Sequence, residues 1–403
     1  MGSIMTEDVS ASGPSIDLSI SDYIEPGSWL GVLGGGQLGR MFTHAAQRMG
    51  YHVAVFEPEA DCPAGQVAEK HFCSALSDES SEQLVLEMSK LCSVITLEFE
   101  NIPTEILRIG GRASRTNPSA DFLEMCQDRL KEKSALQQAG FPTTPFQSVA
   151  SLEQLLQAGE SLGWPLVLKT ARSGYDGKGQ SLVRSKGDAA SVWKQLDTSS
   201  AIAEQWIDFD AEVSMITARN ARGQIECYPL FENDHTNHIL DITRCPVSAH
   251  LRPLEDQAAE ICRGIATSFG VLGLFCVEFF VSANGQLMIN EIAPRPHNSG
   301  HLTIEAFTCS QFEQQVRAIC NLPLVPPSML RPAAMANLLG DLWRDGPPNW
   351  EKVLAEPAAH LHLYGKSDPR PGRKVGHITV LDESSSEAAI TAQELRETLV
   401  HHV

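Results

Sequence analysis

Short apolar runs that alternate with amphipathic stretches organise the first third of the chain. Three runs have the length of a buried strand, namely Ser28–Leu33, His52–Phe56 and Val94–Leu97. A helix-like stretch, Arg40–Met49, follows the first run, and strands that alternate with helices are typical of a parallel sheet. The pattern predicts a doubly wound α/β domain over residues 27–125. We expect residues 1–26, rich in Ser, Asp and Gly, to form a disordered leader.

The pattern changes after a predicted helix, Asp128–Ala139, and a proline-containing linker. The strand candidates that follow are Leu166–Thr170, Ser181–Arg184, Ala201–Trp206, Glu212–Ala218, Glu226–Phe231, Val277–Val281 and Leu287–Ile292. Turn signals separate most of them, which favours an antiparallel α+β domain over residues 126–325. Within it, residues 148–208 are predicted to form a flap subdomain around a glycine-rich loop.

Residues 326–403 are predicted to form a small, β-rich third unit. Its strand candidates lie around Leu361–Tyr364 and His377–Leu381, and its last helix is expected over Ser386–Val400. The chain is therefore expected to combine an α/β domain, an α+β domain and a small C-terminal domain.

Composition limits the classes of ligand and partner that the chain is expected to bind. The formal net charge of −19 disfavours nucleic acid, so any anionic ligand must be held by a local basic cluster. The ten cysteines show no CxxC pair and no zinc spacing, as expected for reduced thiols of a cytoplasmic protein. No apolar run is long enough to span a bilayer, so no membrane partner is expected.

The motif Gly34-x-Gly36-x-x-Gly39, placed between a strand and a helix, matches the dinucleotide fingerprint, with Glu57 at the expected distance. It leaves three interpretations open. The loop could bind NAD, it could bind another phosphate at the helix N-terminus, or it could be a tight turn without a ligand. An NAD-dependent dehydrogenase has no support from the rest of the chain.

The segment Cys276–Glu291 carries the strongest local argument. Asn284-Gly285 is a signal for a two-residue hairpin turn, which would pair Phe280 with Ile289 and Glu278 with Glu291. Facing carboxylates repel each other unless something compensates, and Mg²⁺ with substrate phosphates does so. The alternatives are a solvated pair or a carboxylate that keeps its proton.

Two further segments concentrate positive charge in this acidic chain. Lys169–Gln180 contains three glycines, an arginine and two lysines, which suits a flap over a triphosphate, although it could be a solvated surface hairpin. The loop Asn290–His301 offers Arg295 and Asn298 to a phosphate, a carboxylate or a polar ligand edge. A last basic cluster could be a phosphate site or a solvated face, and comprises Lys366, Arg370, Arg373 and Lys374.

Taken together, these residues resemble the ATP-grasp superfamily. The resemblance extends from residue 29 to about residue 382, and it is closer still to the N5-carboxyaminoimidazole ribonucleotide synthetase family of purine biosynthesis. The motifs that carry it are Gly34–Met41, Glu98–Asn101, Gly174–Gln180, Asn290–Glu291, Ala293–His301 and Arg370–His377. Some fungal members continue into a mutase domain, and one interpretation is that this chain is the N-terminal part of such an enzyme.

The resemblance implies a homodimer with an N-terminal preATP-grasp domain, a central ATP-grasp domain and a small C-terminal domain. It implies ATP and Mg²⁺ as cofactors, and aminoimidazole ribonucleotide and bicarbonate as substrates that react through carboxyphosphate. The runner-up is another ATP-grasp ligase of purine metabolism with an acyl phosphate intermediate such as formyl phosphate. A silent nucleotide-binding regulator would be expected to lack Lys169, Glu278 or Glu291, and all three are present.

Residue roles carried over by motif fall into four groups. Mg²⁺ would be held by Glu278 and Glu291. The nucleotide would contact Arg129, Lys169, Gly174, Tyr175, Asp176, Gly177, Lys178, Gly179, Gln180, Glu204, Gln205, Trp206, Ile207, Glu212, His235, Asn290 and Glu291. The ribonucleotide would contact Gln37, Leu38, Tyr175, Asp176, Arg295, His297, Asn298, Lys366, Arg373 and Lys374. Catalysis would use Asp176, Lys178, Arg295 and Lys374, with His297 as an alternative base to Asp176. Some family members have Arg where this chain has Lys178, which changes the geometry of that contact.

Overall fold

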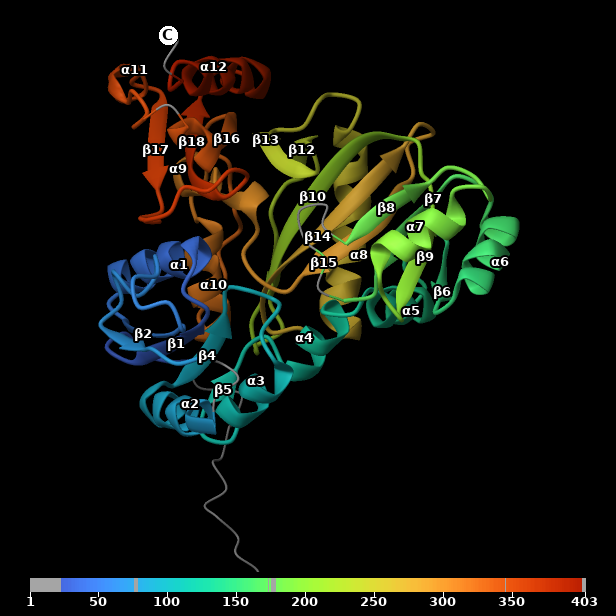
Figure 1. The fold of residues 1–403 in the computed structure, drawn as a ribbon. Coiled ribbons are helices and arrows are strands. Elements are labelled where there is room, and N and C mark those ends of the chain that lie inside the picture. The colour runs from blue at the N-terminus through green and yellow to red at the C-terminus, as the bar shows by residue number, and fades with distance from the viewer. Residues whose placement is uncertain (1–22, 76–78, 173, 175–178, 345, 401–403) are drawn as a thin grey trace, which may run out of the picture.

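The computed structural model describes residues 23–75, 79–172, 174, 179–344 and 346–400. Its N-terminal domain is a parallel five-stranded sheet in the order β3-β2-β1-β4-β5 (Figure 1). The strands are β1 Trp29–Leu33, β2 His52–Phe56, β3 Lys70–Phe72, β4 Val94–Leu97 and β5 Arg115–Thr116. The helices are α1 Gln37–Arg48, α2 Glu79–Leu91, α3 Thr104–Gly110 and α4 Ala120–Cys126. Every residue of β4 is buried, as continuous apolar strands of a covered parallel sheet require. The predicted doubly wound fold is confirmed.

Order begins before the predicted boundary at residue 27. Ile24 is buried, its backbone N–H donates to Cys320 O, and its carbonyl accepts from the Tyr51 hydroxyl. The expectation that the disordered leader extends to residue 26 is therefore wrong for residues 23–26, because Ile24 adds an apolar side chain to the domain core.

The flap subdomain contains an antiparallel sheet in the order β6-β9-β7-β8. Its elements are β6 Phe146–Val149, α6 Leu152–Leu162, β7 Leu166–Thr170, β8 Gln180–Val183, α7 Ala189–Leu196 and β9 Ala201–Gln205. Helix α5, Arg129–Gln138, precedes it, and its N-cap Asp128 accepts from the backbone N–H of Leu130 and Lys131. In Figure 1 this subdomain stands beside the large sheet.

The large sheet has nine strands in the order β15-β14-β10-β12-β13-β16-β18-β17, with β11 paired to β10. Its strands are β10 Phe209–Arg219, β11 Ile225–Cys227, β12 Phe231–Thr236, β13 Ile239–Cys245, β14 Gly273–Ser282, β15 Leu287–Ala293, β16 Ala333–Leu339, β17 Ala359–Leu363 and β18 Lys374–Leu381. The helices are α8 Glu255–Ser268, α9 Thr303–Ala306, α10 Gln311–Ile319, α11 Glu351–Ala355 and α12 Ser385–Glu397. Short 3₁₀ turns lie at Arg252–Leu254, Asn298–Gly300 and Gly340–Trp343. Among the described residues, no helix is long and apolar enough to cross a membrane.

Two features of this sheet differ from the sequence expectations. The single strand expected over Glu226–Phe231 is instead divided, because its first two residues end β11, residues 228–230 form the connection, and Phe231 begins β12. The C-terminal unit also has no separate sheet, because β16 pairs with β13 and continues the central sheet into β18 and β17. This continuity brings the basic residues of the C-terminal domain toward the central domain.

The hairpin β14–β15 keeps Glu278 opposite Glu291, as predicted, but by a different route. Ser282 and Gln286 flank a three-residue loop, in which Gly285 has φ +78°. The longer loop pairs Phe279, and not Phe280, with Ile289, and a β-bulge then restores the pairing of Glu278 with Glu291. The predicted Phe280–Ile289 pair is therefore wrong.

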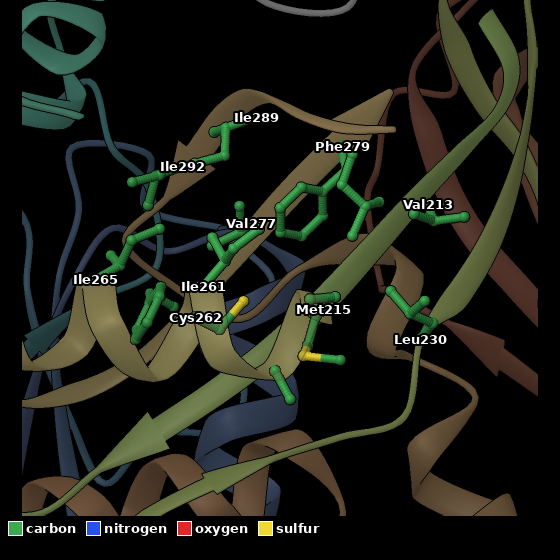
Figure 2. Packing of buried hydrophobic residues seen from close by; sticks show 14 of the residues in the cluster. Val213, Met215, Leu230, Ile261, Cys262, Ile265, Val277, Phe279, Ile289 and Ile292 are labelled. Carbon is green, nitrogen blue, oxygen red and sulfur yellow. The ribbon is translucent and has the colours of Figure 1, made fainter. Parts of the chain in front are cut away.

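The core beneath this hairpin lies between helix α8 and strands β10, β14 and β15. Figure 2 shows Val277, Phe279, Ile289 and Ile292 pointing into the cluster with Ile261 and other buried side chains of α8. Because successive strand residues point to opposite faces, Glu278 and Phe280 lie on the other face of β14. Because the apolar face of the hairpin is buried in the core, the carboxylates on its opposite face point into a cavity.

Candidate active site

The two central carboxylates are held in different electrostatic environments. Glu278 Oε1 lies 2.8 Å from His297 Nε2. Burial opposes ionisation of Glu278, but the charge of His297 and its hydrogen bond lower the pKa of that carboxyl to about 2. Burial, and then the charge of Glu278, raise the pKa of Glu291. One carboxylate is therefore stabilised as an anion, whereas at its neighbour burial and repulsion outweigh the attraction of Arg129 and Lys169.

The imidazole of His297 has partners at both ring nitrogens. Besides the Nε2 contact with Glu278, Nδ1 lies 2.8 Å from Ser299 Oγ, which in turn lies 2.8 Å from Ser214 Oγ. These contacts fix the orientation of the ring toward Glu278. The alternative role of His297 as a base stays a prediction.

The donor set fits magnesium. No cluster of three or more His, Cys, Asp or Glu side chains with metal-binding geometry occurs in the described part of the chain. Magnesium usually takes only one or two protein carboxylates and completes its shell with phosphates and water. A cation between Glu278 and Glu291 would remove the repulsion that raises the pKa of Glu291.

A cavity of about 970 Å³ opens on one side of the carboxylate pair. Ten residues predicted to bind the nucleotide line it, in addition to Glu291: Arg129, Lys169, Gln180, Glu204, Gln205, Trp206, Ile207, Glu212, His235 and Asn290. They come from α5, the flap subdomain and the large sheet, so the cavity lies between these parts.

Ion pairs organise the polar end of this first cavity. Glu204 Oε2 lies 2.9 Å from Lys169 Nζ, and Glu204 Oε1 lies 3.6 Å from Lys133 Nζ. Burial opposes ionisation of Glu204, but the charges of Lys169 and Lys133 lower the pKa of that carboxyl to about 2. On the large sheet, Glu212 Oε2 lies 2.6 Å from His235 Nδ1 and raises the pKa of His235 despite its burial.

Part of the predicted flap lies outside the described residues, namely Tyr175, Asp176, Gly177 and Lys178. Of its flanking residues, Gly174 accepts from Arg129 Nη2 at 2.9 Å through its carbonyl. The Gly179 carbonyl accepts from Thr170 N at 2.8 Å. The flap predictions for residues 175–178 stay predictions.

A second cavity, of about 650 Å³, opens on the other side of the carboxylate pair. It is lined by all eight residues of the predicted ribonucleotide set that the structure describes: Gln37, Leu38, Arg295, His297, Asn298, Lys366, Arg373 and Lys374. These residues come from three parts of the chain, and the cavity assembles them at the junction of all three domains.

Positive charge in the second cavity is held by specific contacts. Arg295 forms an ion pair with Glu100, which raises the pKa of the Arg295 guanidinium although burial acts in the opposite direction. Lys366 Nζ donates to the Lys374 carbonyl at 2.7 Å. Burial, and then the charge of Arg373, lower the pKa of Lys366 to about 8. This cluster is suited to an anionic group, whose charge would offset the repulsion among the cations.

The N-terminal glycine motif binds carboxylates of its own domain. Gly36 N donates to Glu98 Oε1 at 2.7 Å, Gly39 N to Glu98 Oε2 at 3.1 Å, and Gly35 N to Glu57 Oε2 at 2.9 Å. A Cβ atom on Gly36 would lie 2.7 Å from Glu98 Oε1, so glycine is required by the internal carboxylate. This arrangement leaves no room for a dinucleotide phosphate against these amides.

Sequence reasoning missed several residues of the site. Glu98, Phe99, Glu100 and Asn101 line the second cavity, although the motif was used only as a family signature. A signal was present, because these residues follow β4, and ligands of such sheets bind beyond the carboxyl ends of strands where the strand order reverses. The stacking of Phe209 on Phe280, with centroids 4.8 Å apart beside the first cavity, had no sequence signal.

The two cavities meet at the carboxylate pair. The residues that line both are Arg129, Glu278, Glu291, His297, Asn298 and Lys374. A nucleotide in one cavity and an acceptor in the other would therefore approach each other across Glu278 and Glu291. The antiparallel flap, the large sheet and the facing carboxylates define an ATP-grasp protein.

Comparisons with known proteins agree with this class and narrow it. Three family models match in order: the ribonucleotide synthetase preATP-grasp domain at residues 28–127, the ATP-grasp domain at 134–312, and the phosphoribosylaminoimidazole carboxylase C-terminal domain at 333–391. N5-carboxyaminoimidazole ribonucleotide synthase of Bacillus subtilis is 38% identical over 367 residues, which is 90% of this chain and 94% of that protein. The chain belongs to the N5-carboxyaminoimidazole ribonucleotide synthase family.

Solved structures agree with this assignment. The Staphylococcus aureus N5-carboxyaminoimidazole synthetase complexed with ADP has a TM-score of 0.86 at 37% identity, and the match covers 93% of this chain and 98% of that chain. The Aspergillus clavatus synthase in complex with ADP and 5-aminoimidazole ribonucleotide has a TM-score of 0.84 at 31% identity, with the same coverage. One relative of this fold therefore holds both kinds of ligand that the two cavities suggest.

Proposed function

We propose that this protein carboxylates 5-aminoimidazole ribonucleotide with ATP and bicarbonate, forming N5-carboxyaminoimidazole ribonucleotide, ADP and phosphate in purine biosynthesis. The observation that carries the proposal is the junction of the two cavities at Glu278 and Glu291. Membership of the N5-carboxyaminoimidazole ribonucleotide synthase family supports the choice of 5-aminoimidazole ribonucleotide as the substrate. The Bacillus subtilis and Staphylococcus aureus relatives carry the name of the carboxyaminoimidazole ribonucleotide synthase, so the formyl phosphate alternative is not favoured.

The chemistry proceeds in three balanced steps. A bicarbonate oxygen attacks the γ-phosphorus of ATP, and the bond to the bridging oxygen breaks, which gives ADP and carboxyphosphate. Carboxyphosphate then divides into CO₂ and phosphate within the closed site, where water is excluded. The exocyclic amine of the ribonucleotide attacks CO₂ and loses a proton, which leaves the N-carboxylated product.

Magnesium held by Glu278 and Glu291 would neutralise charge on the phosphate oxygens of the nucleotide. The protein's own residues orient the reactants around it. Lys169 and Arg129 line the nucleotide cavity and supply positive charge toward the phosphates. His297 holds Glu278 in place through its 2.8 Å contact.

The acceptor side is proposed from the second cavity. Arg295 and Lys374 would stabilise carboxyphosphate and the departing phosphate, and Lys366 and Arg373 would receive the phosphate of the ribonucleotide. From the family resemblance, Asp176 would orient the amine and accept its proton, with Lys178 beside the carboxyphosphate. Full turnover by Asp176→Asn would disprove the role of Asp176.

The decisive experiment measures ADP release from Mg·ATP and bicarbonate, with and without aminoimidazole ribonucleotide. We expect release to be stimulated strongly by the ribonucleotide and to require bicarbonate, with one N-carboxylated product formed per ADP. Absence of stimulation would disprove the substrate assignment but would leave the ATP-grasp fold unaffected.

We also propose that the protein is a cytoplasmic homodimer. Support comes from the family resemblance and from the ten free cysteines, seven of which are buried. Light scattering of the purified protein should give twice the mass of 43.9 kDa. A mass equal to one chain would contradict the dimer without affecting the proposed reaction.

A further inference from the structure

Strand β15, which carries Asn290 and Glu291, lies at the edge of the large sheet next to β14. Edge strands usually expose a row of unpaired backbone groups. Here the outer groups are bonded to the protein. Ile289 N donates to Pro142 O at 2.9 Å, Ile289 O accepts from Lys133 Nζ at 3.3 Å, and Ile292 N donates to Glu132 Oε2 at 3.2 Å.

These contacts flank the two residues that face the nucleotide. The β14–β15 pairing is irregular between Phe279 and Glu278, where Asn290 is the extra residue of a bulge. At a bulge the neighbouring strand does not hold every backbone group, so the direction of Glu291 is not fixed by β14 alone. On the outer edge of β15, the Lys133 side chain bonds to Ile289 immediately before Asn290–Glu291. The Glu132 side chain bonds to Ile292 immediately after them.

Both side chains are ionisable groups placed where charge is costly: burial, and then the charge of Glu291, raise the pKa of Glu132 to about 8, and burial lowers the pKa of Lys133. Glu132 and Lys133 are 2% and 1% exposed, and they are consecutive residues of α5. Burial of an ionised group is unfavourable unless it is paired and hydrogen-bonded, and apolar residues of similar size often give equal stability. A role in stability alone therefore explains these two residues poorly.

Lys133 also connects the β14–β15 hairpin to the first cavity. Its ammonium donates to Thr144 Oγ1 at 2.6 Å and lies 3.6 Å from Glu204 Oε1. Glu204 lines the first cavity and is paired with Lys169, which lies 3.5 Å from Asn290 Oδ1. One buried ammonium thus joins β15, the linker before the flap and the end of β9.

We propose that Glu132 and Lys133 are positioning residues for Mg·ATP, which fix the bulge at Asn290 so that Glu291 stays opposite Glu278. This inference rests on the proposed function. Neither residue needs to touch the metal or the nucleotide. Glu132 acts on the Ile292 amide beside the metal ligand, whereas Lys133 acts on both the Ile289 carbonyl and Glu204.

The test is calorimetric binding of a non-hydrolysable ATP analogue to the full chain, with excess Mg²⁺ and with EDTA. The ratio of the two affinities isolates the contribution of the metal. Glu132→Asp keeps a carboxyl group but withdraws it from the Ile292 amide, and Lys133→Met keeps much of the volume but removes the ammonium. Lys131→Met is the matched control, because Lys131 is an exposed neighbour on α5 that pairs only with Glu124 in the described contacts.

We expect Glu132→Asp to lower the Mg²⁺-dependent ratio by about 10- to 100-fold, the range for residues that support metal ligands, with little change in EDTA. Lys133→Met should lower the ratio similarly and weaken binding in EDTA as well. Glu132→Gln retains an acceptor for Ile292 N and should restore most of the ratio. Lys131→Met should match the wild type throughout, and Lys133→Met should match it in ribonucleotide binding, whereas Glu132 lines the second cavity and its variants do not serve for that comparison.

Three outcomes would overturn the inference in distinguishable ways. A wild-type ratio in Glu132→Asp and Lys133→Met, together with a lost ratio in Glu291→Gln, would reject the positioning role and retain the metal site. A wild-type protein without Mg²⁺ dependence would reject the metal site of the proposed function, and the inference with it. Loss of ribonucleotide binding in Lys133→Met would indicate general damage to the fold and would also reject the positioning role.

Discussion

At the scale of single residues, repulsion between the two facing carboxylates disfavours the ionised form of one of them, Glu291. Burial and the charge of Glu278 raise the pKa of Glu291, so ionised Glu291 is unfavourable in the folded protein without a cation. Glu291→Gln should therefore increase the free energy of unfolding in EDTA at neutral pH, because it removes a buried charge that the charge of Glu278 repels. The same variant should lose at least about tenfold in Mg·ATP affinity.

Chemical denaturation and analogue titration on the same preparation measure both effects. Glu278→Gln is the matched variant, and it should not be stabilising, because His297 lowers the pKa of Glu278 to about 2 and would lose its partner. Destabilisation by Glu291→Gln in EDTA would contradict this account of the pair.

A second residue-scale prediction concerns the carboxylate that fills the glycine loop. Glu98→Ala leaves the amides of Gly36 and Gly39 without their acceptor, which should cost about 1–3 kcal/mol of stability. Because Glu98 lines the second cavity, KM for the ribonucleotide should rise more than KM for Mg·ATP. Steady-state kinetics with each substrate varied in turn measures this split, and an equal rise in both values would contradict it.

At the scale of elements, the sequence predicted the right carboxylate pair because two features that it missed, the longer loop and the bulge, shift the strand register in opposite directions. The Asn284-Gly285 signal suggests a two-residue turn, but the loop has three residues, which shifts the pairing by one. The bulge at Asn290 shifts it back. Apolar runs locate strands such as β2 and β4 to the residue, because β4 is buried throughout and β2 is buried in all residues after its first. They cannot locate a bulge, because Lys133 and Glu132 create that geometry from a distant helix.

The loop itself gives an element-scale prediction. Gly285 has φ +78°, and a Cβ there would meet no atom within 4 Å. Gly285→Ala should therefore destabilise the protein by about 1 kcal/mol through backbone conformation alone. Because the bulge and the α5 contacts lie beyond this loop, Mg·ATP affinity should not change. Urea denaturation measures the first effect, and a loss of Mg²⁺ dependence would show that the turn, and not the bulge, sets the carboxylate register.

At the scale of the whole molecule, three domains meet at a junction that local sequence patterns do not predict. The second cavity combines Gln37 of the N-terminal domain, Arg295 of the central domain and Lys366 of the C-terminal domain. The continuous sheet from β13 into β16 makes this possible (Figure 1). Local periodicity identified each domain but carried no information on how they join, so only the family resemblance grouped these residues in advance.

Two buried histidines occupy the same junction. The His301 and His377 rings lie 4.9 Å apart, and His362 stacks on His377 with centroids 4.3 Å apart. Burial lowers the pKa of both His301 and His377 well below 6.5, and the charges of neighbouring His362 and, for His301, of His297, Lys374 and Arg295 act in the same direction. Both rings are therefore neutral in the folded protein at pH values where the unfolded chain is already protonated.

Acid should consequently weaken the junction. Below about pH 6.5 the unfolded chain binds protons that the folded protein excludes, so the free energy of unfolding should fall by about 1.4 kcal/mol per pH unit for each ring. Above pH 6.5 this contribution is constant. Urea denaturation between pH 5 and 7.5 measures the slope, and the double variant His301→Gln, His377→Gln should be flatter in the acidic range even if it is less stable at pH 7.5. An unchanged slope in the double variant would assign the acid sensitivity to other groups.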